Sequence, residues 1–238
     1  KIEGIDVSGI NDGTLTLSVV LIDAAGNRGE PAEDTVTKDT VAPLKPTIDT
    51  PITGDGIVSR SEKAAVSVSG TAEAGSRVSV TFEDASGNTA VESTITGSDG
   101  SWTLAAGLSG LIDGVVSIKA EAADAAGNVS GLETSGLIMD TVSETPEIYD
   151  ISTDNIINKA EERSITVSGG NAEANAAIAV TLGNEDFSLL RNINADADGN
   201  WSFTQNVSSF DDGTIEIKVI STDEYENESD EAVKTFTK

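Results

Sequence analysis

The sequence contains no cysteine and no histidine among its 238 residues. Without cysteine the chain has no disulfide, no structural zinc site built on thiolates and no cysteine nucleophile. Without histidine it lacks the commonest general base, so a Ser-His-Asp triad is excluded. Aromatic residues make up 4% of the chain and hydrophobic residues 37%, which suits small β-domains better than one large enzyme core. We therefore do not expect an enzyme.

Positive charge is also scarce, because 14 Lys and Arg stand against 41 Asp and Glu, for a net charge of -27. Such a charge repels nucleic acid and anionic membrane surfaces, so neither is expected as a partner. It also opposes a compact or stacked state unless cations compensate. Divalent cations are one candidate, and a solvated, halophilic surface is the alternative. No run of 18 apolar residues and no signal peptide is found, so membrane insertion is not expected and targeting signals are expected outside this sequence.

Internal repetition, by contrast, runs through the whole chain. Residues 23–27 and 124–128 both read Asp-Ala-Ala-Gly-Asn, and residues 223–227 keep the Asp and the Asn. The motif starts at residues 23, 124 and 223, so its steps are 101 and 99 residues. A period of that size is a domain, and the chain is predicted to be a tandem array. The predicted units are the C-terminal part of a domain at 1–41 and full domains at 42–141 and 142–238.

Each unit is predicted to consist of short strands. Asp-Gly turns at residues 12–13, 113–114 and 212–213 lead into runs in which apolar residues alternate with polar ones. Such alternation indicates half-buried strands. About seven short strands per ~100 residues are typical of an immunoglobulin-like sandwich. The predicted fold class is therefore all-β, with tandem immunoglobulin-like β-sandwiches that form an elongated rod.

The two tryptophans, Trp102 and Trp201, follow directly on Asp-Gly turns. Two interpretations are an exposed platform for a sugar and a place in the sandwich core. We favour the core, because few other aromatic residues are available to fill it.

Proline marks the boundaries between the units. Residues 39–46 contain Pro43 and Pro46, and residues 140–146 end at Pro146. Proline removes a backbone donor and biases its predecessor to extended conformations, so these segments are predicted to be short, stiff linkers. Stiff linkers transmit orientation from one domain to the next. The first unit lacks the first half of the repeat, so we expect it to be incompletely packed.

Several motifs carry a family resemblance: Val-Ser-Gly-Thr-Ala-Glu-Ala-Gly at 68–75, Asp-Gly-Ser/Asn-Trp at 99–102 and 198–201, and Asp-Thr-Val-Ala-Pro at 39–43. With the Asp-Ala-Ala-Gly-Asn loop, they resemble the bacterial Ig-like repeats of giant adhesins exported by type I secretion, over essentially the whole chain. The resemblance implies a surface-anchored rod whose repeats bind calcium and whose ligand-binding tip lies elsewhere. It also implies export of an unfolded chain that folds outside the cell. The third repeat departs from the pattern, with Glu-Tyr-Glu for Ala-Ala-Gly and an extra residue in the turn at Gly169.

The sandwich topology predicts where acidic loops meet. In a seven-stranded unit the B–C, D–E and F–G loops lie at the end that faces the preceding domain. Carboxylates from the end of one unit and the loops of the next therefore converge, and they repel unless a cation binds. Calcium accepts roughly six to eight oxygens in flexible geometry, whereas magnesium is more exacting. The predicted calcium ligands are Asp12, Asp23, Asn27, Asp39, Glu73, Asp99, Asp113, Asp124, Asn128, Asp140, Glu173, Asp198, Asp223 and Asn227, with Asp196 as a further candidate.

Each of these residues also has a plain structural interpretation. Asp and Asn favour turns because their side chains bond to nearby backbone, and we prefer that interpretation for Asp12, Asp113 and Asp212 in Asp-Gly turns. For the aspartates of the linkers and of the loop starts we prefer calcium. A second candidate site at the A–B end stays open between the two interpretations. Its residues are Asp55, Glu62, Asn155, Asn158 and Glu161.

The function expected is structural: a spacer or stalk of a large, calcium-stiffened bacterial surface adhesin, secreted to the cell surface, with roles in adhesion, biofilm formation or virulence. Expected partners are calcium, neighbouring repeats, and host-cell surfaces or glycans bound by domains outside this sequence, with the chain itself a monomer. One alternative is a carbohydrate- or protein-binding module, disfavoured because equivalent loops repeat. Another is an accessory domain of an extracellular enzyme. A hydrolase with paired carboxylates, such as Asp196 and Asp198, would lack a histidine, a motif and a large cleft.

Overall fold

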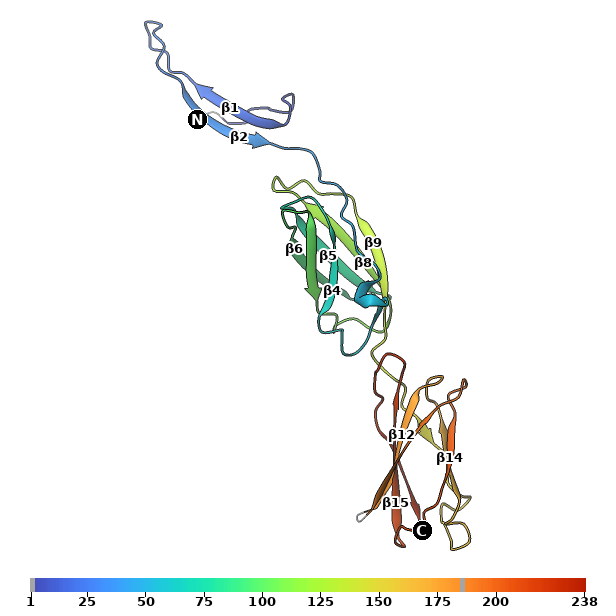
Figure 1. Cartoon of the computed structure of the whole chain (residues 1–238). Helices are drawn as coiled ribbons and strands as arrows, with labels where there is room; N and C mark the ends of the chain where they lie inside the picture. Colours follow the sequence, from blue (N-terminus) through green and yellow to red (C-terminus); the bar gives the residue numbers. More distant parts are fainter. Residues whose placement is uncertain (1–2, 185–186) are drawn as a thin grey trace.

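The computed structural model describes residues 3–184 and 187–238. It confirms the all-β fold class, since the described residues form strands, turns and one 3-10 turn at Ile52–Gly54. Figure 1 shows three bodies in a row along an elongated molecule, with the N-terminus in the first and the C-terminus in the last. No helix in the described residues is long and apolar enough to cross a membrane.

The first body is an antiparallel hairpin of β1 (Gly13–Val19) and β2 (Ala32–Lys38). Its register places Leu15 opposite Val36 and Val19 opposite Ala32. Because side chains alternate along a strand, Leu15, Leu17 and Val19 share one face and the intervening threonine and serine share the other. The amphipathic pattern is therefore realised as a two-stranded ribbon with one apolar face.

The second body is a sandwich of two sheets, called the β3–β9 sandwich below. Its larger sheet has the order β3-β9-β8-β5-β6, and its smaller sheet pairs β4 with β7. The short strand β3 runs parallel to β9, and the other pairs are antiparallel. The strands are β3 Ile57–Val58, β4 Val66–Thr71, β5 Arg77–Asp84, β6 Thr89–Ile95, β7 Ser101–Ala106, β8 Gly114–Ala123 and β9 Glu133–Met139.

The third body, the β10–β16 sandwich, repeats this plan. Its sheets have the orders β13-β12-β15-β16 and β10-β11-β14. A parallel bridge between Ile156 and Thr237 takes the place of the β3–β9 pairing. The additional residue that the sequence shows near Gly169 corresponds to Asn171, which has a φ of 58°. The strands are β10 Glu147–Ile148, β11 Ile165–Gly170, β12 Ala177–Gly183, β13 Ser188–Asn194, β14 Trp201–Gln205, β15 Thr214–Thr222 and β16 Ala232–Thr237.

Each sandwich has its own hydrophobic core. One core runs from Ile52 to Met139 and the other from Ile148 to Phe236. Trp102 and Trp201 are buried in these cores, which confirms the interpretation that we favoured from the sequence. Burial of about 25 cal/mol per Å² of apolar surface is the main term that holds each sandwich together.

The hairpin has apolar residues at the positions that form the cores of the two sandwiches, but in the hairpin they are largely exposed to solvent. Leu17 lies one repeat before Ile118 and two repeats before Ile217, and both isoleucines are completely buried. Leu17, in contrast, is 52% exposed. In the two sandwiches the corresponding strand pairs with a further strand, β5 or β12. The first unit is thus incompletely packed in this structure.

Three loops of the β3–β9 sandwich meet at the end that faces the hairpin. The amide of Ala72 in the β4–β5 loop donates to the carbonyl of Gly100 in the β6–β7 loop. The β8–β9 loop begins where Ala123 pairs with Arg77, the first residue of β5. This arrangement places the repeated Asp-Ala-Ala-Gly-Asn loop next to the linker from the preceding unit.

Candidate functional site

The Asp-Ala-Ala-Gly-Asn loop is a closed turn held by its own side chains. In the copy at 124–128, Oδ1 of Asp124 accepts the amides of Ala126 and Asn128 at 2.8 and 2.9 Å. The Asn128 side-chain amide donates to Oδ2 of Asp124 at 2.9 Å. This side-chain hydrogen bond from Asn128 is the largest of the effects that hold the pKa of Asp124 below its usual value. The carboxylate at the start of the loop therefore already has several donors.

The degenerate third copy makes the same bonds. Asp223 accepts the amides of Tyr225 and Asn227 at 2.8 Å each, and the Asn227 amide group donates back at 2.8 Å. Glu226 occupies the position of Gly127 and takes a φ of 63°, a left-handed conformation that costs a residue with a side chain free energy. The Asp and the Asn are thus sufficient for the turn, and the Gly only makes it easier.

The same motif closes two turns that the sequence reasoning did not identify as copies. Asp84-Ala-Ser-Gly-Asn88 joins β5 to β6, and Asp84 accepts the amides of Ser86 and Asn88. Asp196 accepts the amides of Asp198 and Asn200 in the β13–β14 turn. The spacing Asp-X-X-Gly-Asn was the signal that would have found them. The motif is therefore a general turn, and only the position of a copy at a junction singles it out for a further role.

The Asp-Gly aspartates bond to the linkers. Asp12 accepts the amide and the hydroxyl of Thr40, and Asp113 accepts those of Thr141 at 2.9 Å each. The backbone hydrogen bond from Thr40 lowers the pKa of Asp12. Asp12 and Asp113 thus each anchor the second residue of a linker, as an Asp in a turn does.

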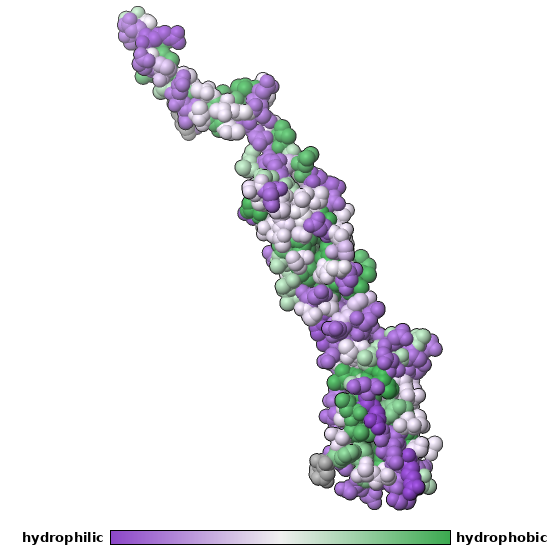
Figure 2. Space-filling model, viewed as in Figure 1, coloured by the Kyte–Doolittle hydropathy of each residue, from purple (hydrophilic) through white to green (hydrophobic). Residues whose placement is uncertain are grey.

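The second junction, defined as residues 140–146 with the loops beside them, brings acidic side chains together. Burial raises the pKa of Asp140, and the nearby carboxylates of Asp223 and Asp113 raise it further. Burial also raises the pKa of Glu173, to which Asp223 and Asp140 add repulsion. Four of the predicted ligands, from both sandwiches, therefore interact at this junction. Figure 2 shows the hydrophilic residues that gather where the two sandwiches meet.

These four residues are oxygen donors from loops, the type of ligand that calcium accepts. Burial is the first cause of the raised pKa values of Asp140 and Glu173, and repulsion from neighbouring carboxylates adds to it. A divalent cation would relieve that repulsion. Within residues 3–184 and 187–238, however, no three acidic side chains are already close enough together to hold a metal ion. The oxygen donors of these four residues are of the type that calcium binds, and their side chains would have to move closer together to coordinate one ion.

The first junction, defined as residues 39–46 with the adjoining loops, is more open. The Asn128 amide group reaches the carbonyl oxygen of Asp39 at 3.2 Å. Asp99 accepts hydrogen bonds from the amide and the hydroxyl of Ser101, and the backbone hydrogen bond lowers the pKa of Asp99.

The remaining predicted ligands lie in separate turns. Glu73 lies in the β4–β5 loop beside Ala72, and Asp23 and Asn27 close the exposed turn of the hairpin. In the third unit Asp198 is an exposed member of the β13–β14 turn.

The second candidate site, at the A–B end, is held by capping bonds. Glu62 accepts the amide of Ser59, and Glu161 accepts the amide of Asn158. Asp55 accepts the amide of Ile57, and that bond lowers its pKa. Each carboxylate thus satisfies backbone donors of its own turn, the arrangement of a capping box. The turn-forming interpretation accounts for these residues.

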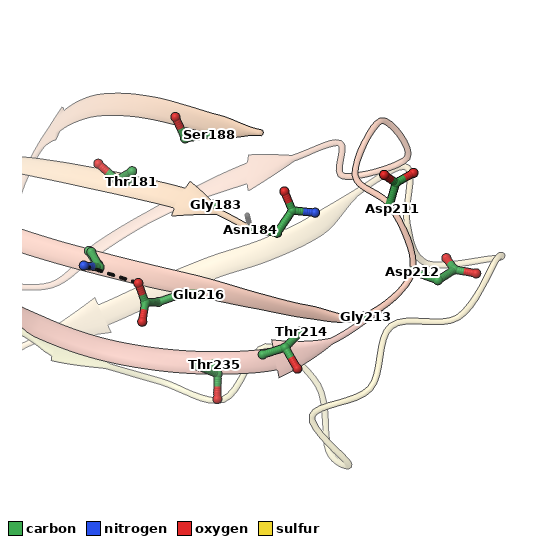
Figure 3. Close-up of a pocket in the computed structure, with 11 residues that line it drawn as sticks. Thr181, Gly183, Asn184, Ser188, Asp211, Asp212, Gly213, Thr214, Glu216 and Thr235 are labelled. Atoms are coloured by element: carbon green, nitrogen blue, oxygen red, sulfur yellow. Dashed lines mark ion pairs between the residues drawn. The ribbon is translucent and has the colours of Figure 1, made fainter. Parts of the chain in front are cut away.

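A cavity lies at the far end of the β10–β16 sandwich. Its lining includes Asn184, Asp211 and Asp212, and Glu216 pairs with Lys218 at 3.3 Å. Figure 3 shows Asp211 and Asp212 on the loop that leads into β15. Within the described part of the chain, none of the predicted ligands lines this cavity. The cavity is separate from both junctions.

Comparisons with known proteins show what the chain is similar to. The sequence model of a bacterial Ig-like domain matches residues 35–141. A solved structure from a study of host cell surface retention of a 1.5-MDa bacterial ice-binding adhesin has a TM-score of 0.51 and 24% identity, over 95% of this chain and 74% of that chain. Another, a Ca2+-stabilized adhesin that helps an Antarctic bacterium reach out and bind ice, has a TM-score of 0.50 and 27% identity, over 94% and 56%. No curated protein sequence matches the chain.

These matches support an immunoglobulin-like sandwich fold, and both solved structures belong to bacterial adhesins. The likeness to the first structure shows the fold, and the chain spans little more than half the length of the second. Neither the family model nor these two structures indicates a catalytic family.

Proposed function

We propose that this chain is a structural spacer, a set of stalk repeats in a large calcium-stiffened bacterial surface adhesin. The observation that carries the proposal is the in-line array of equivalent sandwiches, joined by short proline-containing linkers with acidic loops at the joints. The 27% identity to a Ca2+-stabilized adhesin supports it. The proposed units are the C-terminal part of a bacterial Ig-like domain at 1–41 and full domains at 42–141 and 142–238.

The proposed partners are calcium and the neighbouring repeats, with host-cell surfaces or glycans bound by domains outside this sequence. The chain acts as a monomer, exported by type I secretion and extracellular, in adhesion, biofilm formation or virulence. The giant non-fimbrial adhesin of Salmonella, biofilm-associated proteins and marine ice-associated adhesins are the kind of parent protein that the motifs resemble. A spacer of this kind places a distal binding domain at a distance from the cell.

Calcium has two roles in this proposal. At both junctions it neutralises carboxylates that would otherwise repel, and at the open first junction it also limits bending. Ligands for the second junction are Asp113, Asp140, Glu173 and Asp223. Extracellular modules typically bind calcium with dissociation constants of about 10⁻⁴–10⁻³ M, so millimolar calcium is the relevant range.

The test is calorimetric titration of the metal-free chain with calcium, together with thermal unfolding. A ligand at about 100 times its dissociation constant stabilises the folded state by about 2.7 kcal/mol. We expect heat of binding and a higher melting temperature in calcium. Millimolar calcium that produces neither heat nor a shift would refute the calcium role.

Replacing Asp140 by Asn sharpens this test. The change removes one of the repelling carboxylates, so Asp140→Asn should raise the stability of the metal-free chain. It should also reduce the stabilisation by calcium, since a ligand is lost. Glu92→Gln, which removes a charge from exposed β6, is the matched control and should leave the calcium response intact. An unchanged calcium response in Asp140→Asn would exclude Asp140 as a ligand.

A further inference from the structure

The second junction contains a network of direct hydrogen bonds between the two sandwiches. The side chain of Asn227, only 1% exposed, lies at its centre. Its Oδ1 accepts the backbone amide of Arg60 at 2.8 Å, and its Nδ2 donates to the carbonyl oxygen of Asp140 at 2.9 Å. Arg60 follows β3 and Asp140 follows β9. One buried side chain of the β10–β16 sandwich is thus fixed to two separate segments of the preceding sandwich.

The linker is held from both sides as well. Arg60 Nε, on the upstream side, donates to the carbonyl oxygen of Thr141 at 2.9 Å. On the downstream side, the hydroxyl of Ser221 donates to the carbonyl oxygen of Glu144 at 2.7 Å and lies 3.1 Å from that of Ser143. Thr141, Ser143 and Ser221 are all buried. The backbone of this linker therefore has few ways to rotate without breaking buried or partly buried bonds.

The β15–β16 loop also packs beside the turn that follows β3. Tyr225 and Glu224 line a cavity together with Asp55, Ser59 and Ser61. The Glu-Tyr-Glu replacement, which distinguishes this repeat from its neighbours, therefore adds side chains to the joint. The residues at which the third repeat departs from the other two therefore lie at the same junction as the hydrogen-bond network.

The first junction differs at the corresponding positions. Ala42 and Ala122 stand where the second junction has Ser143 and Ser221, so the hydroxyl pair is missing. Six residues separate Asp39 from Pro46, whereas five separate Asp140 from Pro146. The first linker is therefore both longer and without these bonds.

The residues of the two linkers also differ in their exposure to solvent. Leu44 in the first linker is 86% exposed and Val41 is 69% exposed. In the second linker Thr141 and Ser143 are buried. The two junctions consequently have different degrees of constraint, and the first joins a partial unit to a full sandwich whereas the second joins two full sandwiches.

Bending the second junction would leave buried donors and acceptors without partners. Each such group would lose its hydrogen-bond partner without gaining water in exchange, and bonds shielded from water reinforce one another. We propose that the second junction is a rigid joint whose orientation is set by these direct hydrogen bonds and persists without a divalent cation. The cation of the proposed function then adds stability at this junction, while the first junction depends on it for stiffness.

The absence of cysteine makes site-directed spin labelling direct, since no native thiol competes. Glu92→Cys with Thr204→Cys spans the second junction, and Thr16→Cys with Glu92→Cys spans the first; all three positions are exposed. Distance distributions are measured by double electron–electron resonance on the full chain, in calcium and in chelator. For the second junction we expect a narrow distribution that chelation does not broaden. Broadening of that distribution in chelator would overturn the proposal.

The network itself is tested with Ser221→Ala, which installs the residue of the first junction, and with Arg60→Ala. Either change should broaden the distribution across the second junction in chelator, whereas Ser209→Ala, at an exposed position in the turn before β15, should not. Circular dichroism and tryptophan emission establish that each variant is folded. Folded variants that keep the narrow distribution would show that the hydrogen bonds do not set the orientation.

The two proposals fail independently. If calcium changes neither junction, the calcium role in the proposed function is wrong, while the narrow distribution across the second junction in chelator still supports the rigid joint.

Discussion

At the residue scale, the feature that recurs is an aspartate bonded to an asparagine four residues later. The Asp oxygens accept two amides and the Asn side chain, as in residues 124–128 and 223–227. Carboxylates with several donors are stabilised in the charged form. Among the residues that the structure describes, this Asp–Asn pair closes tight turns at five places, of which the copies at 124–128 and 223–227 lie next to linkers.

The left-handed Glu226 provides a test of this turn. Glu226→Gly should stabilise the β10–β16 sandwich by about 0.5–1 kcal/mol, because glycine adopts a φ of 63° without strain. Urea unfolding followed by tryptophan emission measures the change. Gly127→Ala is the reciprocal control and should destabilise the β3–β9 sandwich by about 1 kcal/mol. A loss of stability in Glu226→Gly would mean that contacts of the Glu226 side chain outweigh its backbone strain.

Asp84 predicts a dependence of stability on pH. The side-chain hydrogen bond from Asn88 is the main cause that lowers the pKa of Asp84 to about 2, from an ordinary 3.8. Because the folded state binds this proton less tightly than the unfolded state, the contribution is complete above about pH 4 and is lost as pH falls towards 2. Replacing Asp84 by Asn should therefore flatten the pH dependence of the β3–β9 sandwich in that range.

Denaturant unfolding at pH 5 and at pH 2.5 measures this effect in a variant that keeps Trp102 as the single tryptophan. The β10–β16 sandwich has Asn184 at the corresponding position, so its own pH dependence should not change when Asp84 is replaced. Equal slopes for the parent and the Asn variant would contradict the assignment.

At the scale of elements, the same strand has different surroundings in different units. Ile118 in β8 is covered by a second sheet, whereas Leu17 in β1 is half exposed. Strand pairing alone gives a two-stranded ribbon little stability, and the core supplies the rest. The repeated sequence therefore determines where a strand forms, whereas the strands and sheets packed against it determine how much it contributes to stability.

Two matched truncations quantify this difference. Ile118→Ala should destabilise the β3–β9 sandwich by about 2–5 kcal/mol, because a buried side chain leaves a cavity. Leu17→Ala should leave the unfolding of both sandwiches within measurement error. A large effect of Leu17→Ala would indicate that the apolar face of the hairpin is covered in solution.

At the scale of the whole molecule, the open first junction should govern the response to calcium. Small-angle scattering should give a shorter maximum dimension after chelation, because the hairpin then samples bent orientations relative to the β3–β9 sandwich. Calcium in excess should restore the longer particle, whereas magnesium, with its stricter geometry, should do so less well. An unchanged maximum dimension in chelator would refute calcium-dependent stiffening.

The sequence by itself determined the fold class, the repeat period and the chemistry of the loops. Alternation of apolar residues and a period near 100 residues can both be read from the order of residues along the chain. The strands and the successive units of the tertiary structure follow these two patterns. The core positions of Trp102 and Trp201 also followed from the scarcity of aromatic residues. The turn-forming role of Asp12 and Asp113 was one of two interpretations, and their bonds to the linker threonines are what that interpretation expects.

Only the tertiary structure decided how the two junctions differ. The sequence shows Ser143 and Ser221 where the first junction has Ala42 and Ala122. Only the fold shows that these two serines, 78 residues apart, meet at the second junction. Likewise, the pKa values of Asp140 and Glu173 are raised first by burial and then by carboxylates on other elements. Electrostatic repulsion and buried hydrogen bonds depend on distances in space, and the order of residues along the chain does not contain those distances.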